Sequence, residues 1–139
     1  MNEATFSSSP RSFQVLILEP SEKLSTEIIS ALREAQPGTS SAVARSVAEA
    51  QRLVIEQKPE LFVLDVDADY AAAQEFLYDL RTSHPDARAI ILTGSHFTAQ
   101  REEVAGLGAI HFLEKPFPRG DFIALAEALL APAGSGEGE

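Results

Sequence analysis

The sequence predicts an α/β protein with a doubly wound, parallel sheet whose five strands lie in the order 2-1-3-4-5. Two observations support this prediction. Apolar runs alternate with segments of helical period at a step of about 25 residues, the pattern of repeated βα units. The runs themselves, such as Leu61-Phe62-Val63-Leu64, show no polar alternation, as expected for strands covered on both faces. Right-handed crossovers then favour the flavodoxin-like order 2-1-3-4-5.

Strand and cap signals mark the first half of the chain. Ser21 and Ser46 each precede a segment of helical period and suit the N-cap, where a side-chain oxygen accepts a backbone N–H. Glu49 follows Ser46 at the spacing of a capping box. The expected elements are a strand over 13–18, a helix from 21 to 36, a weaker edge strand over 39–45, a helix from 46 to 58, and a strand that begins at 61 and ends at Asp65.

The second half continues the alternation. Asp69 suits the N-cap of a helix that His84-Pro85-Asp86 terminates, and Pro118 opens the last helix. Strands are expected over 89–93 and 109–113. Between them, Thr98 to Ala105 has helical character but few large apolar residues, so we expect this helix to be the most loosely held element.

Composition limits the class of protein. The 21 acidic residues against 11 Lys and Arg give a net charge of −10 without a basic cluster, which argues against direct nucleic-acid binding. No apolar run approaches the roughly 20 residues of a membrane span, no signal peptide is apparent, and a cytoplasmic protein is expected. The absence of cysteine excludes disulfides and thiol chemistry. We expect one domain over 13–131, with a flexible tail at 1–12 and a disordered tail at 132–139.

Polar residues follow four of the predicted strands. Glu19, Asp65, Thr93 and Lys115 each stand at or just after a strand's carboxyl end. An acid in this place is often only a turn residue or a helix cap. In open α/β sheets, however, ligands bind in the crevice beyond the carboxyl ends of the strands, near the switch point between strands 1 and 3. Four convergent polar groups therefore indicate a functional site.

Three of these residues, Asp65, Thr93 and Lys115, lie in segments that resemble the response-regulator receiver domain of two-component signalling, and the resemblance extends over about 13–130. The similarity rests on three segments: 59–65 (PELFVLD), 90–94 (IILTG) and, most specifically, 108–117 (GAIHFLEKPF). The resemblance implies that Asp65 accepts a phosphoryl group and that Thr93 and Lys115 bind its oxygens. It also implies a cis bond between Lys115 and Pro116.

The resemblance also implies a weak Mg²⁺ site. The family holds the metal with the phosphoacceptor, an acidic pair after the first strand and a backbone carbonyl two residues beyond the acceptor, the position of Asp67 here. The acidic pair reads Glu19-Pro20 in this chain, and proline has no side-chain oxygen to offer a cation that demands near-octahedral coordination. Glu19, Asp65 and Asp67 are therefore expected to form a weakened metal site. The family's aromatic switch position is Phe112, which has no hydroxyl.

Three functions follow as alternatives. The favoured one is a receiver that takes a phosphoryl group from a histidine kinase or phosphotransfer protein. It would act on a downstream protein through the face of the fourth helix, fifth strand and fifth helix, with a homodimer left open. The second is a pseudo-receiver that acts as a phosphorylation-independent interaction module. The third, a haloacid-dehalogenase-like phosphatase, lacks the further acidic pair that such enzymes need after Lys115, so no enzyme is expected.

Overall fold

The central sheet has the predicted order. The computed structural model describes residues 13–94 and 110–130. Within them, five parallel strands lie in the order β2-β1-β3-β4-β5. The strands are β1 (Phe13–Leu18), β2 (Thr39–Ala44), β3 (Leu61–Asp65), β4 (Arg88–Thr93) and β5 (Ile110–Glu114). The strand predicted over 39–45 is thus at an edge, as expected.

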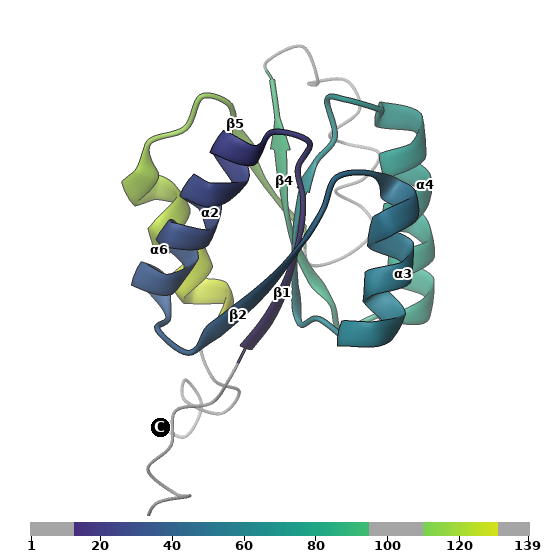
Figure 1. Cartoon of the computed structure of the whole chain (residues 1–139), viewed down its shortest axis with the longest axis horizontal. Helices are drawn as coiled ribbons and strands as arrows, with labels where there is room; N and C mark the ends of the chain where they lie inside the picture. The colour runs from purple at the N-terminus through teal and green to yellow at the C-terminus, as the bar shows by residue number, and fades with distance from the viewer. Residues whose placement is uncertain (1–12, 95–109, 131–139) are drawn as a thin grey trace, which may run out of the picture.

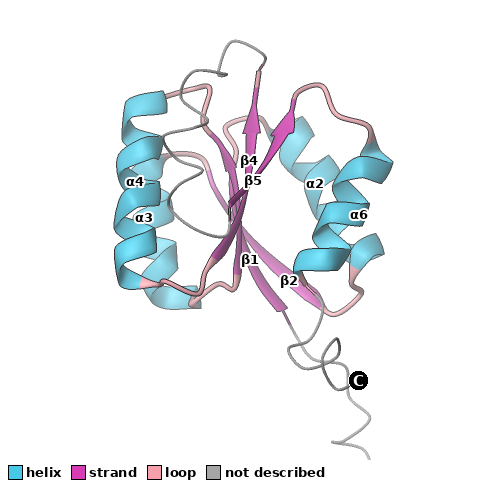
Figure 2. Cartoon of the chain, turned by 180° about the vertical axis from the view of Figure 1, so that it is seen from behind, coloured by secondary structure: helices cyan, strands magenta, loops and turns pink. Residues whose placement is uncertain are grey.

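Helices cover both faces of the sheet. Figures 1 and 2 show α2 (Glu22–Ala35) and α6 (Arg119–Leu129) on one face, and α3 (Val47–Gln57) and α4 (Tyr70–Ser83) on the other. The predicted helix at 98–105 and both predicted tails lie outside the described residues. Among the helices that the structure describes, none is long and apolar enough to cross a bilayer.

Side-chain caps begin three of the helices as predicted. The Ser21 Oγ accepts a hydrogen bond from the Leu24 N–H at 3.2 Å, and Asp69 caps α4 in the same way. At α3 the Ser46 Oγ accepts from the Glu49 N–H at 3.2 Å, but the Glu49 carboxylate accepts from the N–H of Arg45, one residue before the cap. In the predicted capping box the Glu49 carboxylate would accept from the N–H of Ser46, the N-cap residue itself. The observed bond goes to the preceding residue instead.

The core consists of one apolar layer on each side of the sheet. Residues that alternate along the strands point to opposite faces, so neighbouring side chains enter different layers. Leu16, Leu64 and Ile91 pack with Phe76 under α3 and α4, and Phe62 meets Phe76 edge-on at 6.4 Å. The layer under α2 and α6 contains Val15, Ile17, Ile28, Leu32, Val63, Ile90 and Phe122. Each such side chain contributes about 1.5–3 kcal/mol by leaving water.

The strand register places the predicted site residues at one edge of the sheet. Asp65 pairs with Leu92, so β3 and β4 end together. Beyond the strands the ladder continues for one more bond on each side: the Val66 N–H donates to the Leu92 carbonyl at 3.2 Å, and the Lys115 N–H donates to the Thr93 carbonyl at 2.7 Å. These bonds fix the backbone of the residues that follow the strands.

Candidate functional site

Asp65 and Lys115 form the centre of the site. Asp65 is the last residue of β3 and is 7% exposed. The Lys115 Nζ lies 2.8 Å from its Oδ2, and the Asp67 N–H donates to its Oδ1 at 2.9 Å. The bond between Lys115 and Pro116 is cis, as the resemblance implied. Both oxygens of Asp65 therefore have a donor, and its charge faces an ammonium group.

The Asp67 side chain occupies a position that the sequence did not predict. Its carboxylate accepts from the Gly94 N–H at 3.0 Å, accepts from the Thr93 Oγ at 3.2 Å and lies 3.0 Å from the Lys115 Nζ. Burial opposes ionisation, but these donors outweigh it and lower the pKa of Asp67 below its usual value. The spacing of two acids in Asp65-Val66-Asp67 was the available signal, but the sequence assigned Asp67 to the weakened metal site and not to these donors.

Glu19 lies on the other side of Asp65, in the opposite environment. Its side chain is buried, with the residue 2% exposed. Its Oε2 accepts from the Ser21 N–H at 3.0 Å, whereas its Oε1 has no hydrogen-bond partner among the described residues. Burial, with the adjacent Asp65 as the next cause, raises the pKa of Glu19 to about 7.

The balance of charge in the crevice is negative. Three carboxyl groups, on Glu19, Asp65 and Asp67, meet one ammonium group among the described residues, that of Lys115. Burial disfavours the charged ammonium, but the two bonded aspartates outweigh this effect and raise the pKa of Lys115. Lys115 is therefore a cation at neutral pH, and among the described residues it is the one ammonium group that contacts the two aspartates.

Arg45 holds the backbone of Glu19 in place by hydrogen bonds. Its Nη1 donates to the Glu19 carbonyl at 2.8 Å and to the Ser25 Oγ at 3.0 Å. Ser25 is only 2% exposed and passes a further bond to the Glu22 carbonyl. The guanidinium thus ties the end of β1 to the first turn of α2. The two bonds of Arg45 join residues at least 20 positions apart, and the sequence pattern contained no signal for them.

The acidic groups fit a metal ion only in part. The unpartnered Oε1 of Glu19, buried beside Asp65, is a suitable ligand for a hard cation. The Asp67 carboxylate, however, is turned toward Thr93, Gly94 and Lys115. Within the ranges 13–94 and 110–130, no three acidic or histidine side chains converge on one point suited to a metal. Pro20 has no side-chain oxygen to add as a ligand, so a weakened metal site stays a prediction.

The remaining predicted residues take simple positions. Thr93 is buried, and its hydroxyl reaches Asp67. Phe112 is half-buried and packs against the core layer under α3 and α4. His111 is exposed on the edge strand β5, as expected for a solvated strand residue.

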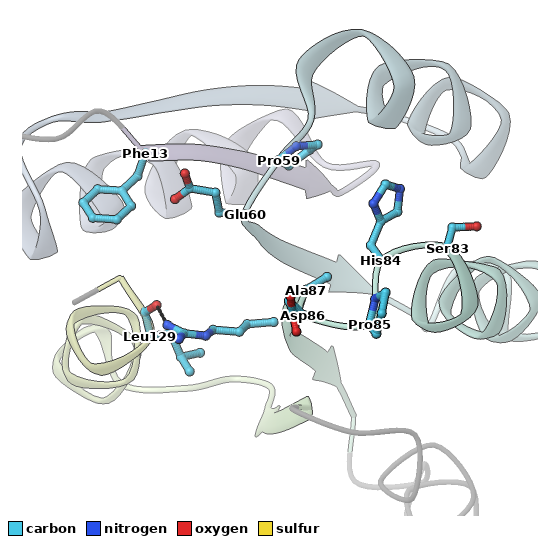
Figure 3. A pocket seen from close by; sticks show the side chains of 10 residues that line it. Phe13, Pro59, Glu60, Ser83, His84, Pro85, Asp86, Ala87 and Leu129 are labelled. Atoms are coloured by element: carbon cyan, nitrogen blue, oxygen red, sulfur yellow. Dashed lines mark hydrogen bonds between the residues drawn. The ribbon is translucent and has the colours of Figure 1, made fainter. Parts of the chain in front are cut away.

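Two cavities of similar size lie at opposite ends of the sheet. One of about 490 Å³ reaches Asp65 between the first turns of α3 and α4. The other, of about 480 Å³, is at the amino ends of the strands, where Phe13, Glu60 and His84 line it and Arg88 donates to the Leu129 carbonyl (Figure 3). Of the predicted site residues, Asp65 lines the first cavity, and its place beyond the carboxyl ends of the strands agrees with the crevice rule for α/β sheets.

Comparison with protein families gives a single match over most of the chain. The model of the response regulator receiver domain family matches residues 15–127. This range begins at the third residue of β1, includes the other four strands, and covers the four described helices up to Glu127. No curated protein is similar enough in sequence to count as a match.

Solved structures share the fold. The chain is similar to NtrX from Brucella abortus, crystallised with ADP, with a TM-score of 0.74 and 20% identity over 86% of this chain and 26% of that one. It is similar to a response regulator from Thermotoga maritima, with a TM-score of 0.76 and 17% identity over 88% and 100% of the two chains. The chemotaxis response regulator CheY4 of Vibrio cholerae has a TM-score of 0.74 and 20% identity, over 86% and 100%. The chain thus spans about a quarter of NtrX and the full length of the other two.

Proposed function

We propose that Asp65 accepts a phosphoryl group in two-component signalling. The premise is that this chain belongs to the response-regulator receiver family. The observation that carries the proposal is the Lys115 Nζ at 2.8 Å from the Asp65 carboxylate, with the Thr93 hydroxyl in the same crevice. A nucleophile, a cation and a hydroxyl donor are the groups that phosphoryl transfer to a carboxylate requires.

The transfer would proceed from a phosphohistidine on a histidine kinase or phosphotransfer protein. An Asp65 oxygen attacks phosphorus, the P–N bond breaks, and the leaving imidazole takes a proton from water. The product is an aspartyl phosphate. The transferring group spreads charge over its oxygens, and Lys115 offsets the repulsion between that charge and the attacking carboxylate. The domain is then a phosphoryl acceptor and switch, not an enzyme with its own turnover.

A weak Mg²⁺ site belongs to the proposal. Glu19, Asp65 and the Asp67 carbonyl are the groups that would hold the ion, and when bound it supplies positive charge to the transferring oxygens. The buried, unpartnered Oε1 of Glu19 supports this assignment. The proline at position 20 and the longer glutamate side chain are the reasons for expecting low affinity.

The phosphodonor would dock on the groove beside Lys115. Leu24 and Glu27 of α2, with Pro116 and Phe117 of the following loop, line a hollow next to the ammonium-bearing residue. It adjoins a second hollow between α2 and α6, of about 270 Å³, where Phe117 stacks on Phe122 at 5.7 Å. An apolar floor with acidic and basic residues at its rim suits an amphipathic helix of a partner protein.

The output would be a change of the interaction face that includes β5 and α6, with the segment 98–105 as its third part. Of this face, β5 is an edge strand whose residues are half-buried or exposed. Phe112 on β5 contacts the core and would report phosphorylation by a change of burial. A downstream protein, or a second copy of the chain, is the proposed partner of this face.

The decisive experiment is intact mass after incubation with phosphoramidate and Mg²⁺. We expect the mass of one added phosphoryl group in the wild type and none in Asp65→Asn. Asp79→Asn, which removes an equal charge from an exposed position on α4, is the matched control and should label like the wild type. Labelling that persists in Asp65→Asn would refute the assigned acceptor.

Docking is tested separately. Leu24→Ala and Phe117→Ala should slow phosphotransfer from a protein donor while leaving labelling by phosphoramidate unchanged, because the small donor needs no groove. Ile55→Ala removes an exposed apolar side chain on the far face and is the control. An equal loss with both donors would place the effect in the site itself, not in docking.

One observation favours a second function, the pseudo-receiver. The acidic pair is reduced to Glu19, and three carboxyl groups, on Glu19, Asp65 and Asp67, share one ammonium group among the described residues, that of Lys115. In that case the fold would present the same interaction face without phosphorylation. A partner that binds wild type and Asp65→Asn with equal affinity, together with no mass change from any donor, would support this function over the first.

A further inference from the structure

We propose that the Asp67 carboxylate is an internal stand-in for the phosphoryl group, which must be displaced before Asp65 can be phosphorylated. The inference concerns the regulation of the proposed phosphoryl acceptor and rests on that function. It starts from the three donors around Asp67: the Thr93 hydroxyl, the Gly94 N–H and the Lys115 ammonium.

These donors face the space in which a phosphoryl group on Asp65 would lie. Lys115 bridges the two carboxylates, at 2.8 Å from Asp65 and 3.0 Å from Asp67. The Asp67 N–H itself donates to Asp65 at 2.9 Å, so the two acids are held side by side. A phosphoryl group attached to Asp65 would therefore extend into the same donor set.

The three donors around Asp67 can together bind an anion that has several oxygens. A hydroxyl comes from Thr93 in β4, a backbone N–H from Gly94, which follows β4, and an ammonium from Lys115, after β5. The Gly94 N–H is 3.0 Å from one Asp67 oxygen and 3.3 Å from the other, so it is directed between them. A carboxylate in this position receives the charge-assisted bonds that a phosphoryl group would receive.

Two anions cannot share this set at full strength. The Gly94 N–H and the Thr93 hydroxyl each carry one hydrogen, so a bond to Asp67 excludes an equal bond to a phosphoryl oxygen. A phosphorylated side chain also carries a charge of about −1.5 to −2 near neutral pH, so it would be repelled by the Asp67 carboxylate. Phosphorylation thus requires Asp67 to rotate out to solvent, which its partial exposure of 23% permits.

The consequence is a receiver that resists phosphorylation by small donors. The Thr93 hydroxyl lies 3.2 Å from both the Asp67 carboxylate and the Gly94 carbonyl, so Asp67 competes for this donor without any phosphoryl group. Removal of the carboxylate should therefore free the donors and accelerate labelling of Asp65.

The test compares Asp67→Ala and Asp67→Asn with the wild type in labelling by phosphoramidate at fixed Mg²⁺. We expect Asp67→Ala to label at least about tenfold faster, which corresponds to about 1.4 kcal/mol of barrier. Asp67→Asn should gain less because its amide oxygen can still accept from Gly94. Asp79→Asn again controls for the lost charge and should match the wild type. Asp65→Asn in the Asp67→Ala background should abolish labelling.

A second readout does not depend on labelling. Amide hydrogen exchange at Gly94 should be slow in the wild type, where the N–H is bonded, and at least about tenfold faster in Asp67→Ala, by the same conversion of lost stabilisation. If the wild type and Asp67→Ala are labelled at equal rates and labelling still depends on Asp65, the stand-in role of Asp67 is overturned. The proposed function of Asp65 is then unaffected. If neither the wild type nor any variant is labelled, the proposed function fails, and the exchange rate at Gly94 alone tests whether Asp67 occupies the donors. Equal exchange in the wild type and Asp67→Ala would overturn this occupation. Faster exchange in Asp67→Ala would support it.

Discussion

Glu19 and Asp67 flank the same acid, Asp65, and the fold treats them in opposite ways. Asp67 has three kinds of donor around it and a lowered pKa. Glu19 is buried with one oxygen unpartnered and a pKa raised to about 7. The difference shows that burial alone does not set the charge of an acid, because the number of donors directed at it decides whether burial is offset. The side of Asp65 that holds Asp67 is thus supplied with positive charge by Lys115, whereas the described neighbours of Glu19 leave one of its carboxylate oxygens without a hydrogen bond.

The largest effect is expected at Lys115, which supplies most of that charge. Lys115→Met removes the ammonium from both aspartates, and labelling of Asp65 should slow by about 10²–10³-fold, the usual loss for one preorganised donor. Lys23→Met, on the exposed side of α2, is the control and should have no effect. Undiminished labelling in Lys115→Met would mean that the positive side of the crevice is not used in transfer.

The pH dependence of stability should separate the two flanking acids. Because the folded pKa of Glu19 is raised from 4.5 to about 7, the folded state binds its proton more tightly than the unfolded chain. The stability from this group is complete below pH 4.5 and is lost as the pH rises through 7, by an amount on the order of 2–3 kcal/mol. Urea unfolding between pH 4.5 and 8 measures it, and Glu19→Gln should flatten the slope.

For Asp67, the pH dependence of stability has the opposite sign. Its folded pKa is lowered, so its contribution is present above its usual value of 3.8 and is lost as the pH falls through the folded value. Asp67→Asn should therefore change the acid limb of the stability curve and leave the limb between 4.5 and 7 unchanged. If both substitutions altered the same limb, the contrast between the two acids would be wrong.

A smaller gain is expected from restoring the acidic pair. Glu19→Asp combined with Pro20→Asp adds the missing ligand, and even about 1.4 kcal/mol of recovered stabilisation speeds labelling tenfold at saturating Mg²⁺. The gain should disappear with chelator or with Asp65→Asn. A double variant that folds, binds Mg²⁺ tightly and still does not label would make the pseudo-receiver the better function.

The smallest effect concerns the backbone that holds Glu19. Arg45→Met removes two hydrogen bonds, to the Glu19 carbonyl and the Ser25 hydroxyl, and should lower the free energy of unfolding by roughly 1–2 kcal/mol. Arg52→Met is the control, because its ion pairs on α3 are exposed and contribute little. An equal loss in both variants would show that the partly buried bonds of Arg45 contribute no more than the exposed ion pairs of Arg52.

The sequence by itself determined the elements and their order. Apolar runs marked four strands, and a partly alternating segment marked the edge strand β2. Ser21, Ser46 and Asp69 marked three helix starts, because capping depends on residues near one another in the chain. The carboxyl-end rule and the family resemblance then brought Asp65 and Lys115 together, and the structure joins them at 2.8 Å.

Only the tertiary structure decided which donors each acid receives. Asp67 bonds to Thr93 and Gly94, 26 and 27 positions away, and Arg45 reaches back to Glu19 and Ser25. Such contacts depend on strand register, rotamers and the burial of each group, and none of these leaves a periodic trace in the chain. The sequence therefore placed three acids at one edge of the sheet, and the folded chain alone determined that one is saturated with donors while another is left short.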